Sequence, residues 1–162
     1  MKEFDNDCLL MCRIQGRIFE HSLEYLNCSS PLFIKKYMNG EDALSMDRLE
    51  FLNTTKSDIQ VLLEMKDNDY GTIKYSADEL FWIGYIYRYW AYTRNIDSKK
   101  LFKICPGTLL HNYYSRGAFL SEEKVIEEIS ESLNLNIKNE KTLDQKAQNI
   151  IESKISNFKL SI

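Results

Sequence analysis

Residues 80–92 read LFWIGYIYRYWAY, and this stretch decides the fold of the chain. Its large apolar and aromatic side chains cover almost every side of a helix, so other helices must surround it. Ser76-Ala77-Asp78-Glu79 directly before it is a capping box, in which Ser and Glu satisfy each other's exposed backbone donors. The pattern predicts a central helix over about residues 77–94. Gly84 costs about 1 kcal/mol relative to alanine inside a helix, so its presence predicts a close crossing by a neighbouring helix.

The rest of the chain also favours helices. Only 6 Gly and 2 Pro are present, which leaves few residues for hairpin and sandwich turns. Apolar spacing and capping residues predict further helices at residues 5–26, 30–39, 57–66, 98–104, 106–117, 121–133 and 142–158. Residues 41–56 are expected to form one or two short helical turns. We therefore predict an all-α fold, a compact multi-helix bundle around the central helix. A core domain over residues 1–120 would carry an amphipathic helical C-terminal extension over 121–162.

Composition narrows the classes of function. Apolar residues make up 44% of the 162 residues and the net charge is −3, which argues against a general polyanion binder and against a disordered acidic chain. No secretory leader pattern is visible at the N-terminus, and no apolar stretch reaches the roughly 18 residues that a bilayer requires. Four cysteines form no dense framework, so reduced thiols are expected. These features predict a cytoplasmic protein without a membrane partner.

Catalytic and metal-binding patterns are weak. His21 and His111 are the two histidines, and each lies beside aromatic or apolar residues, so we interpret both as structural. No nucleophile-elbow, P-loop or zinc-protease motif is present. Cys8 and Cys12 share one side of a helix, and Cys28 or His21 could complete a zinc shell, but the spacing is not that of a zinc module. We expect no enzyme activity, no metal and no cofactor.

Arg88 is the most informative single residue. A guanidinium in an otherwise apolar helix must be paired or must line a cleft. One interpretation is a salt bridge to an acid such as Asp47 or Asp78, and the other is a role in contacting a partner.

Two further surfaces suggest partners. Residues 76–120 hold 6 basic and 3 acidic side chains together with several tyrosines, and their helix, short helix, helix pattern is similar to a helix-turn-helix. Nucleic acid is therefore an alternative partner, although the lysine and arginine density is low for a DNA reader. The predicted last helix has an apolar stripe that would cover its own domain, a partner or a second copy of the chain. That stripe contains Leu143, Ala147, Ile150, Ile151, Ile155 and Phe158.

The central stretch also resembles a family of small bacterial proteins. Residues 80–90, followed by Tyr92-Thr93 and Ser98-Lys99-Lys100, are similar to a family motif that reads "YWIGYIYRYW" and then "SSK". Residues 15–20, residues 33–39 and Met46-Asp47 are similar to the N-terminal half of that family, so the resemblance covers about residues 13–116. After Tyr114 this chain departs, with Ser-Arg-Gly-Ala-Phe-Leu and a longer tail where relatives have a "YHTLD" turn.

The resemblance implies a function. We associate the family with toxin–antitoxin-like operons, beside ADP-ribosyltransferase-like toxins. It implies a non-enzymatic antitoxin or immunity-like protein that binds and neutralises a cognate toxin encoded nearby. The expected partner-binding residues are Arg88, Tyr92, Arg94, Leu143, Ile150, Ile151 and Phe158. The alternative is a helical DNA-binding transcriptional regulator or autorepressor.

Overall fold

The computed structural model describes residues 3–65 and 71–134. Throughout these residues the regular elements are helical, which confirms the all-α prediction. The chain divides into two compact units, residues 1–122 and 123–162, where the sequence predicted a boundary after residue 120. A helix spans residues 122–134 and agrees with the predicted amphipathic segment. The predicted last helix, from residue 142, lies outside the described residues.

The first unit contains seven α-helices and one short 3-10 helix within its described residues. In chain order they are α1 (Asn6–Tyr25), α2 (Ser30–Met38), α3 (Glu41–Asp47), η1 (Phe51–Asn53), α4 (Asp58–Glu64), α5 (Ala77–Thr93), α6 (Ser98–Ile104) and α7 (Gly107–Gly117). Five of these helices begin where the sequence supplies a capping side chain that accepts a backbone N–H bond. Those residues are Asp5, Ser29, Ser57, Ser76 and Asp97. Local capping chemistry therefore sets most of the helix starts.

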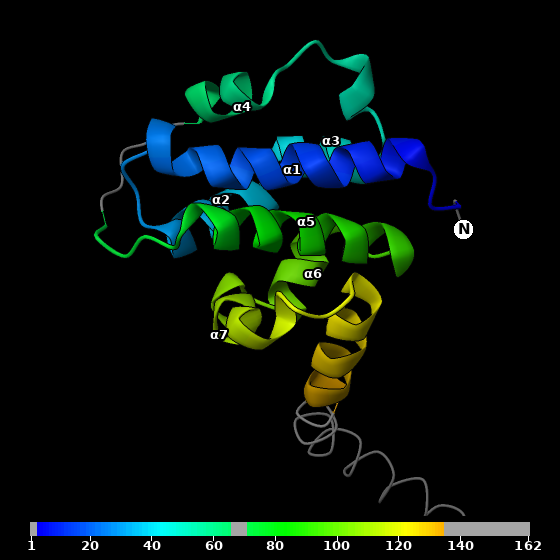
Figure 1. Cartoon of the computed structure of the whole chain (residues 1–162). Helices are drawn as coiled ribbons and strands as arrows, with labels where there is room; N and C mark the ends of the chain where they lie inside the picture. The colour runs from blue at the N-terminus through cyan, green and yellow to red at the C-terminus, as the bar shows by residue number, and fades with distance from the viewer. Residues whose placement is uncertain (1–2, 66–70, 135–162) are drawn as a thin grey trace, which may run out of the picture. The chain divides into compact units, whose positions relative to one another are not determined.

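Helices α1 and α5 form the main pair of the bundle and lie side by side, with α4 against α1 and α7 against α5 (Figure 1). Gly84 allows the close approach of this pair. A Cβ atom built there would lie 2.7 Å from the backbone oxygen of Gln15 and 2.8 Å from the ring of Phe19. The crossing predicted from Gly84 is confirmed, because a side chain at this position would collide with the α1 backbone.

The enclosure of α5 is less complete than the sequence predicted. Tyr87 and Trp90 are buried, together with the aliphatic residues of the same helix. Five other aromatic side chains of α5 keep part of their surface exposed: Phe81, Trp82, Tyr85, Tyr89 and Tyr92. The prediction that neighbours cover every side of this helix was wrong for these positions. Large rings can be packed along one edge and still reach solvent with the other, so an apolar pattern overstates burial.

None of the helices in the described ranges combines the length and apolar character needed to cross a bilayer.

Candidate binding pocket at the end of the central helix

Arg88 lies in the interior at the centre of a polar network. Its side chain is 0% exposed. Nε and Nη2 both donate to Oε1 of Gln15, at 2.9 and 2.8 Å, and Nη1 donates to Oδ1 of Asp47 at 2.5 Å. The pairing of Arg88 with Asp47, one of the two interpretations of this residue, is confirmed. The same burial leaves the guanidinium no surface to offer to a partner, so its expected direct role in partner binding does not fit this structure.

Ser98 completes the network and ties α6 to it. Its Oγ accepts a bond from Nη2 of Arg88 at 2.9 Å and donates to Oδ1 of Asp47 at 2.7 Å. Its backbone N–H donates to the other carboxylate oxygen at 2.9 Å. Burial lowers the pKa of the Arg88 guanidinium, but the combined effect of Asp47, Tyr92 and Tyr37 is larger, so the pKa is raised overall. The result is a charged, fully bonded cluster that joins four helices, α1, α3, α5 and α6.

Tyr92 lies one turn beyond Arg88 on α5 and is held on two sides. The guanidinium carbon of Arg88 lies 5.2 Å from the centre of its ring, within cation–π range. Its hydroxyl donates to the backbone oxygen of Met46 at 2.7 Å. Burial raises the pKa of this hydroxyl well above its ordinary value, although Arg88 partly opposes the effect. Tyr92 is therefore a neutral, fixed side chain whose ring is only partly exposed.

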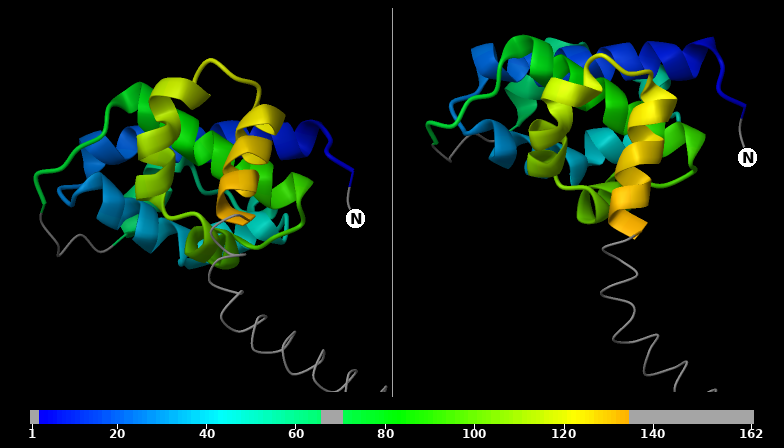
Figure 2. Two further views of the ribbon diagram at one scale, coloured as in Figure 1. Left: turned by 90° about the horizontal axis from the view of Figure 1, so that it is seen from below. Right: turned by 60° about the horizontal axis from the view of Figure 1, so that its bottom comes forward.

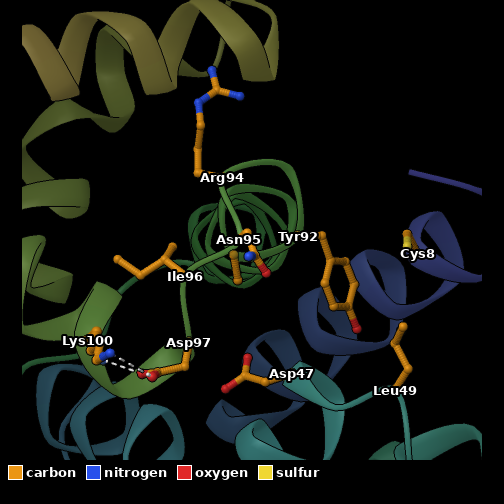
Figure 3. A pocket seen from close by; sticks show the side chains of 10 residues that line it. Cys8, Asp47, Leu49, Tyr92, Arg94, Asn95, Ile96, Asp97 and Lys100 are labelled. Carbon is orange, nitrogen blue, oxygen red and sulfur yellow. Dashed lines mark hydrogen bonds and ion pairs between the residues drawn. The ribbon is translucent and has the colours of Figure 1, made fainter. Parts of the chain in front are cut away.

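A pocket of about 610 Å³ opens beside this ring, between the ends of α3 and α5 and the start of α6. Its lining residues are Cys8, Asp47, Leu49, Ala91, Tyr92, Arg94, Asn95, Ile96, Asp97 and Lys100. In Figure 3 the Tyr92 ring reaches toward Leu49 and Asp47, whereas the Arg94 side chain points away from them. Two of the predicted partner-binding residues, Tyr92 and Arg94, thus line the same pocket. Asp47 also lines this pocket and accepts a hydrogen bond from Arg88.

Two residues of this pocket have backbone conformations that disfavour ordinary side chains. Leu49 has φ 59° and Asn95 has φ 49°, which places both in the left-handed region. Each follows a helix that ends in a Schellman motif, because Glu50 N–H bonds to the Ser45 oxygen and Ile96 N–H to the Ala91 oxygen. Asparagine is common at this position, but leucine carries a steric cost there. The chain tolerates that cost at the wall of the pocket.

The other predicted partner-binding residues, Leu143, Ile150, Ile151 and Phe158, lie outside the described part of the chain.

Both histidines contact carboxylates of other helices. His111 of α7 contacts Oε1 of Glu79 through Nδ1 and stacks on the Tyr75 ring, with 3.9 Å between ring centres. His21 of α1 places Nδ1 2.9 Å from Oδ2 of Asp58, at the start of α4. Neither histidine lines the pocket at the end of α5. Both therefore join helices, in agreement with the structural interpretation.

The four cysteines, all within the described residues, form no disulfide and are buried. Burial raises the pKa of the Cys12 thiol to about 12, against an opposing effect of Arg88, and burial also raises the pKa of Cys105 to about 12. These two thiols are protonated at physiological pH and are poor nucleophiles. Within the described ranges, histidine, cysteine and acidic side chains form no group of three that would suit a metal ion.

Sequence reasoning missed Gln15, Ser98, Leu49 and Asn95. The sequence held one signal for Gln15, because its amide stands among apolar residues on the core side of α1. The structure shows that this side chain is 0% exposed. Ser98 stood out only as part of the family motif, and its place in this network depends on where Asp47 lies. Leu49 gave no signal, because a left-handed leucine cannot be recognised from its neighbours in sequence.

Comparison of the chain with models of protein families, with curated proteins and with solved structures finds no match.

Proposed function

We propose that this protein is a non-catalytic inhibitor of the antitoxin or immunity type, which binds a toxin encoded nearby and covers its active surface. The resemblance of residues 13–116 to small antitoxin-like proteins suggests the class of partner. The pocket at the end of α5 supplies the surface that would hold it. An ADP-ribosyltransferase-like toxin is the specific partner that the resemblance implies.

The observation that carries this proposal is the fixed, partly exposed ring of Tyr92 at the wall of the pocket. Protein interfaces draw most of their affinity from a few aromatic and arginine side chains in well-packed pockets. Here Arg88 and the Met46 backbone fix the ring before binding. A ring that is already ordered loses little conformational entropy in a complex. Leu49 and Ile96 contribute apolar side chains to the lining of the pocket, and Asn95 and Lys100 contribute polar ones.

The ionisable groups of the pocket fit binding better than proton transfer. Both carboxylate oxygens of Asp47 accept bonds from Arg88 or Ser98. Oδ1 of Asp97 accepts the backbone N–H of Lys100 and caps α6, and Oδ2 lies 3.9 Å from the Lys100 ammonium. A general base needs a free position facing the proton that it removes. These carboxylates are better placed to hold the pocket in shape.

The proposal is tested by co-expressing the chain with the product of the neighbouring gene. We expect that product to slow growth when expressed alone, and growth to recover when this chain is present. A tagged form of the chain should also retain the product through purification at moderate salt. Loss of cellular NAD in the unprotected culture would identify an ADP-ribosyltransferase-like toxin.

Two results would contradict the proposal. One is a neighbouring product that is harmless alone, and the other is growth inhibition that this chain does not relieve. The test variant is Tyr92→Ala, which removes the anchor ring, and its matched control is Tyr25→Ala. Tyr92→Ala should lose protection, whereas Tyr25→Ala, on the exposed end of α1, should retain it.

A further inference from the structure

Basic residues are concentrated in two segments that contain no acidic side chain. Residues 98–121 hold Lys99, Lys100, Lys103 and Arg116 but no Asp or Glu, although the whole chain is acidic with a net charge of −3. Residues 25–40 hold Lys35 and Lys36 and again no acid. The first segment forms α6 and α7, and the second contains α2. Basic residues are therefore separated from acidic ones more completely in these two segments than in residues 76–120 as a whole.

The fold brings these two segments together. Helix α2 packs against both α6 and α7, as the views in Figure 2 also show. A Cβ atom at Gly107 would lie 2.9 Å from Ile34, and Asn39 shares a small hollow with Lys99. The two segments thus run in opposite directions, which places Lys103 near the level of Lys35. Lys35, Lys99 and Lys103 are all exposed.

Helix α7, which packs against α2 beside α6, has a polar exposed face. Its exposed residues follow helical spacing i, i+3, i+4, i+7, i+8 and all carry hydrogen-bonding groups: Thr108, His111, Asn112, Ser115 and Arg116. The Tyr75 ring stacks on the face of the His111 ring, and Glu79 contacts its Nδ1. Nε2 is the other hydrogen-bonding atom of this ring. Acidic residues also border this surface: Glu79 contacts His111, Asp97 caps α6, and Glu41 and Asp47 line the Lys99 hollow.

We propose that this surface, the α6–α7 basic face, binds duplex DNA. We define it by Lys35, Lys99, Lys103, Thr108, Asn112 and Arg116. Helix α7 has 11 residues and is about 16 Å long, a size that enters the major groove. Asn, Arg and Thr side chains bond to base edges there, while lysines on flanking helices bond to phosphates. A two-residue connection, Cys105-Pro106, joins α6 to α7, and both helices pack against α2 and α5.

Duplex DNA fits this face better than other polyanions. The residues that define the face carry amines, a guanidinium and small polar groups, and not the aromatic rings that stack single-stranded bases. The exposed large apolar residues of segment 98–121 are Ile104 at the end of α6 and Phe119 beyond the end of α7. A membrane-binding helix would present an apolar side beside its lysines, and the exposed face of α7 from Thr108 to Arg116 is polar. The assignment does not depend on the proposed inhibitor function, because it uses a different surface.

The test measures binding of the isolated full-length chain to a fluorescein-labelled duplex of mixed sequence, roughly 21 base pairs long. Fluorescence anisotropy is recorded at about 50 mM and about 200 mM NaCl, a range over which phosphate contacts weaken strongly. We expect saturable binding that falls with salt. Lys99→Glu/Lys103→Glu should weaken it about tenfold or more and lower the slope of log affinity against log salt by about 2.

The matched control is Arg13→Glu/Arg17→Glu, which makes the same change in net charge on the exposed side of α1. It should alter the affinity by less than about threefold, since distant exposed charges are screened. Circular dichroism melting confirms that both variants fold. Equal losses in the two variants would overturn the proposal, because net charge alone would then explain binding. Absence of duplex binding at low salt would overturn it too, as would tighter binding to single-stranded DNA, polyglutamate or phosphatidylserine vesicles.

Discussion

Arg88 and Asp47 meet in the interior at 2.5 Å although they are 41 residues apart in the sequence. The arginine side chain is 0% exposed and the aspartate side chain 10%. A pair at this depth is costly to break, because the remaining charge has no water to replace its partner. Since Asp47 also lines the pocket, the stability of the fold and the shape of the candidate site depend on the same contact.

Removal of one member of this pair should destabilise the protein strongly. Arg88→Met or Asp47→Ala is expected to lower the free energy of unfolding by about 3–5 kcal/mol, as for other buried ion pairs. Urea denaturation followed by circular dichroism measures it. The double variant should lose clearly less than the sum of the two single losses, because neither charge is then left alone. Additive losses would show that the two groups do not interact in the folded protein.

Gly84 should not tolerate a methyl group. Gly84→Ala gains about 1 kcal/mol of helix propensity but forces the new atom against the backbone oxygen of Gln15, 2.7 Å away. Overpacking of this kind typically costs about 1–3 kcal/mol, so the net change should be a loss. Gly16→Ala is the control, because the atoms nearest to its methyl group would be those of the Phe81 ring, a side chain that can move, and not a backbone oxygen. A thermal melt in which Gly84→Ala is as stable as Gly16→Ala would argue against the tight crossing.

Stability should fall at alkaline pH. Burial raises the pKa of Cys12 and Cys105 to about 12 from an ordinary value of 9.0. Between these values the folded thiols keep protons that the unfolded chain releases, so the free energy of unfolding decreases as pH rises. Each thiol should contribute about 1.4 kcal/mol per pH unit above pH 9. Urea titrations at pH 8, 9 and 10 measure the slope, with each pH set to about 0.1 unit. The Cys12→Ala/Cys105→Ala variant should show a shallower decline, and an unchanged decline would assign the effect to other groups.

Leu49→Gly should have little effect on stability. Glycine relieves the left-handed strain, worth about 1–2 kcal/mol, but loses apolar contacts and adds freedom to the unfolded chain. The opposing effects should leave the free energy of unfolding within about 1 kcal/mol of the parent. Leu44→Gly makes the same change at a helical position of α3 and should cost more. Equal losses in the two variants would mean that Leu49 carries no strain.

Local rules explain which parts of the fold could be predicted. The starts of α2, α4, α5 and α6 follow from capping side chains within a few residues, and these need no tertiary information. The Gly84 crossing was also accessible, since a glycine inside a strongly apolar helix needs a steric reason. The sequence could not show that Arg88 pairs with Asp47 and not with Asp78, because this choice depends on how α3 packs. The Leu49 conformation depends on packing in the same way.

The candidate site was predictable only in part. Tyr92 and Arg94 were among the expected partner-binding residues, and both line the pocket at the end of α5. Arg88 was placed in the same group, although its burial makes it the support of the pocket and not its surface. A charged residue in an apolar helix can have either role, and only its neighbours in space decide between them.

The most direct test of the proposed function is the affinity of the purified neighbouring-gene product for two pocket variants, measured by isothermal titration calorimetry. Leu49→Gly removes apolar wall and Asn95→Gly does not, while both relieve a left-handed backbone. We predict that Leu49→Gly weakens binding about tenfold or more, the effect of losing a buried apolar contact of about 1.4 kcal/mol, and that Asn95→Gly stays within about threefold. Parent-like affinity in a folded Leu49→Gly variant would contradict the assignment of this pocket to the partner.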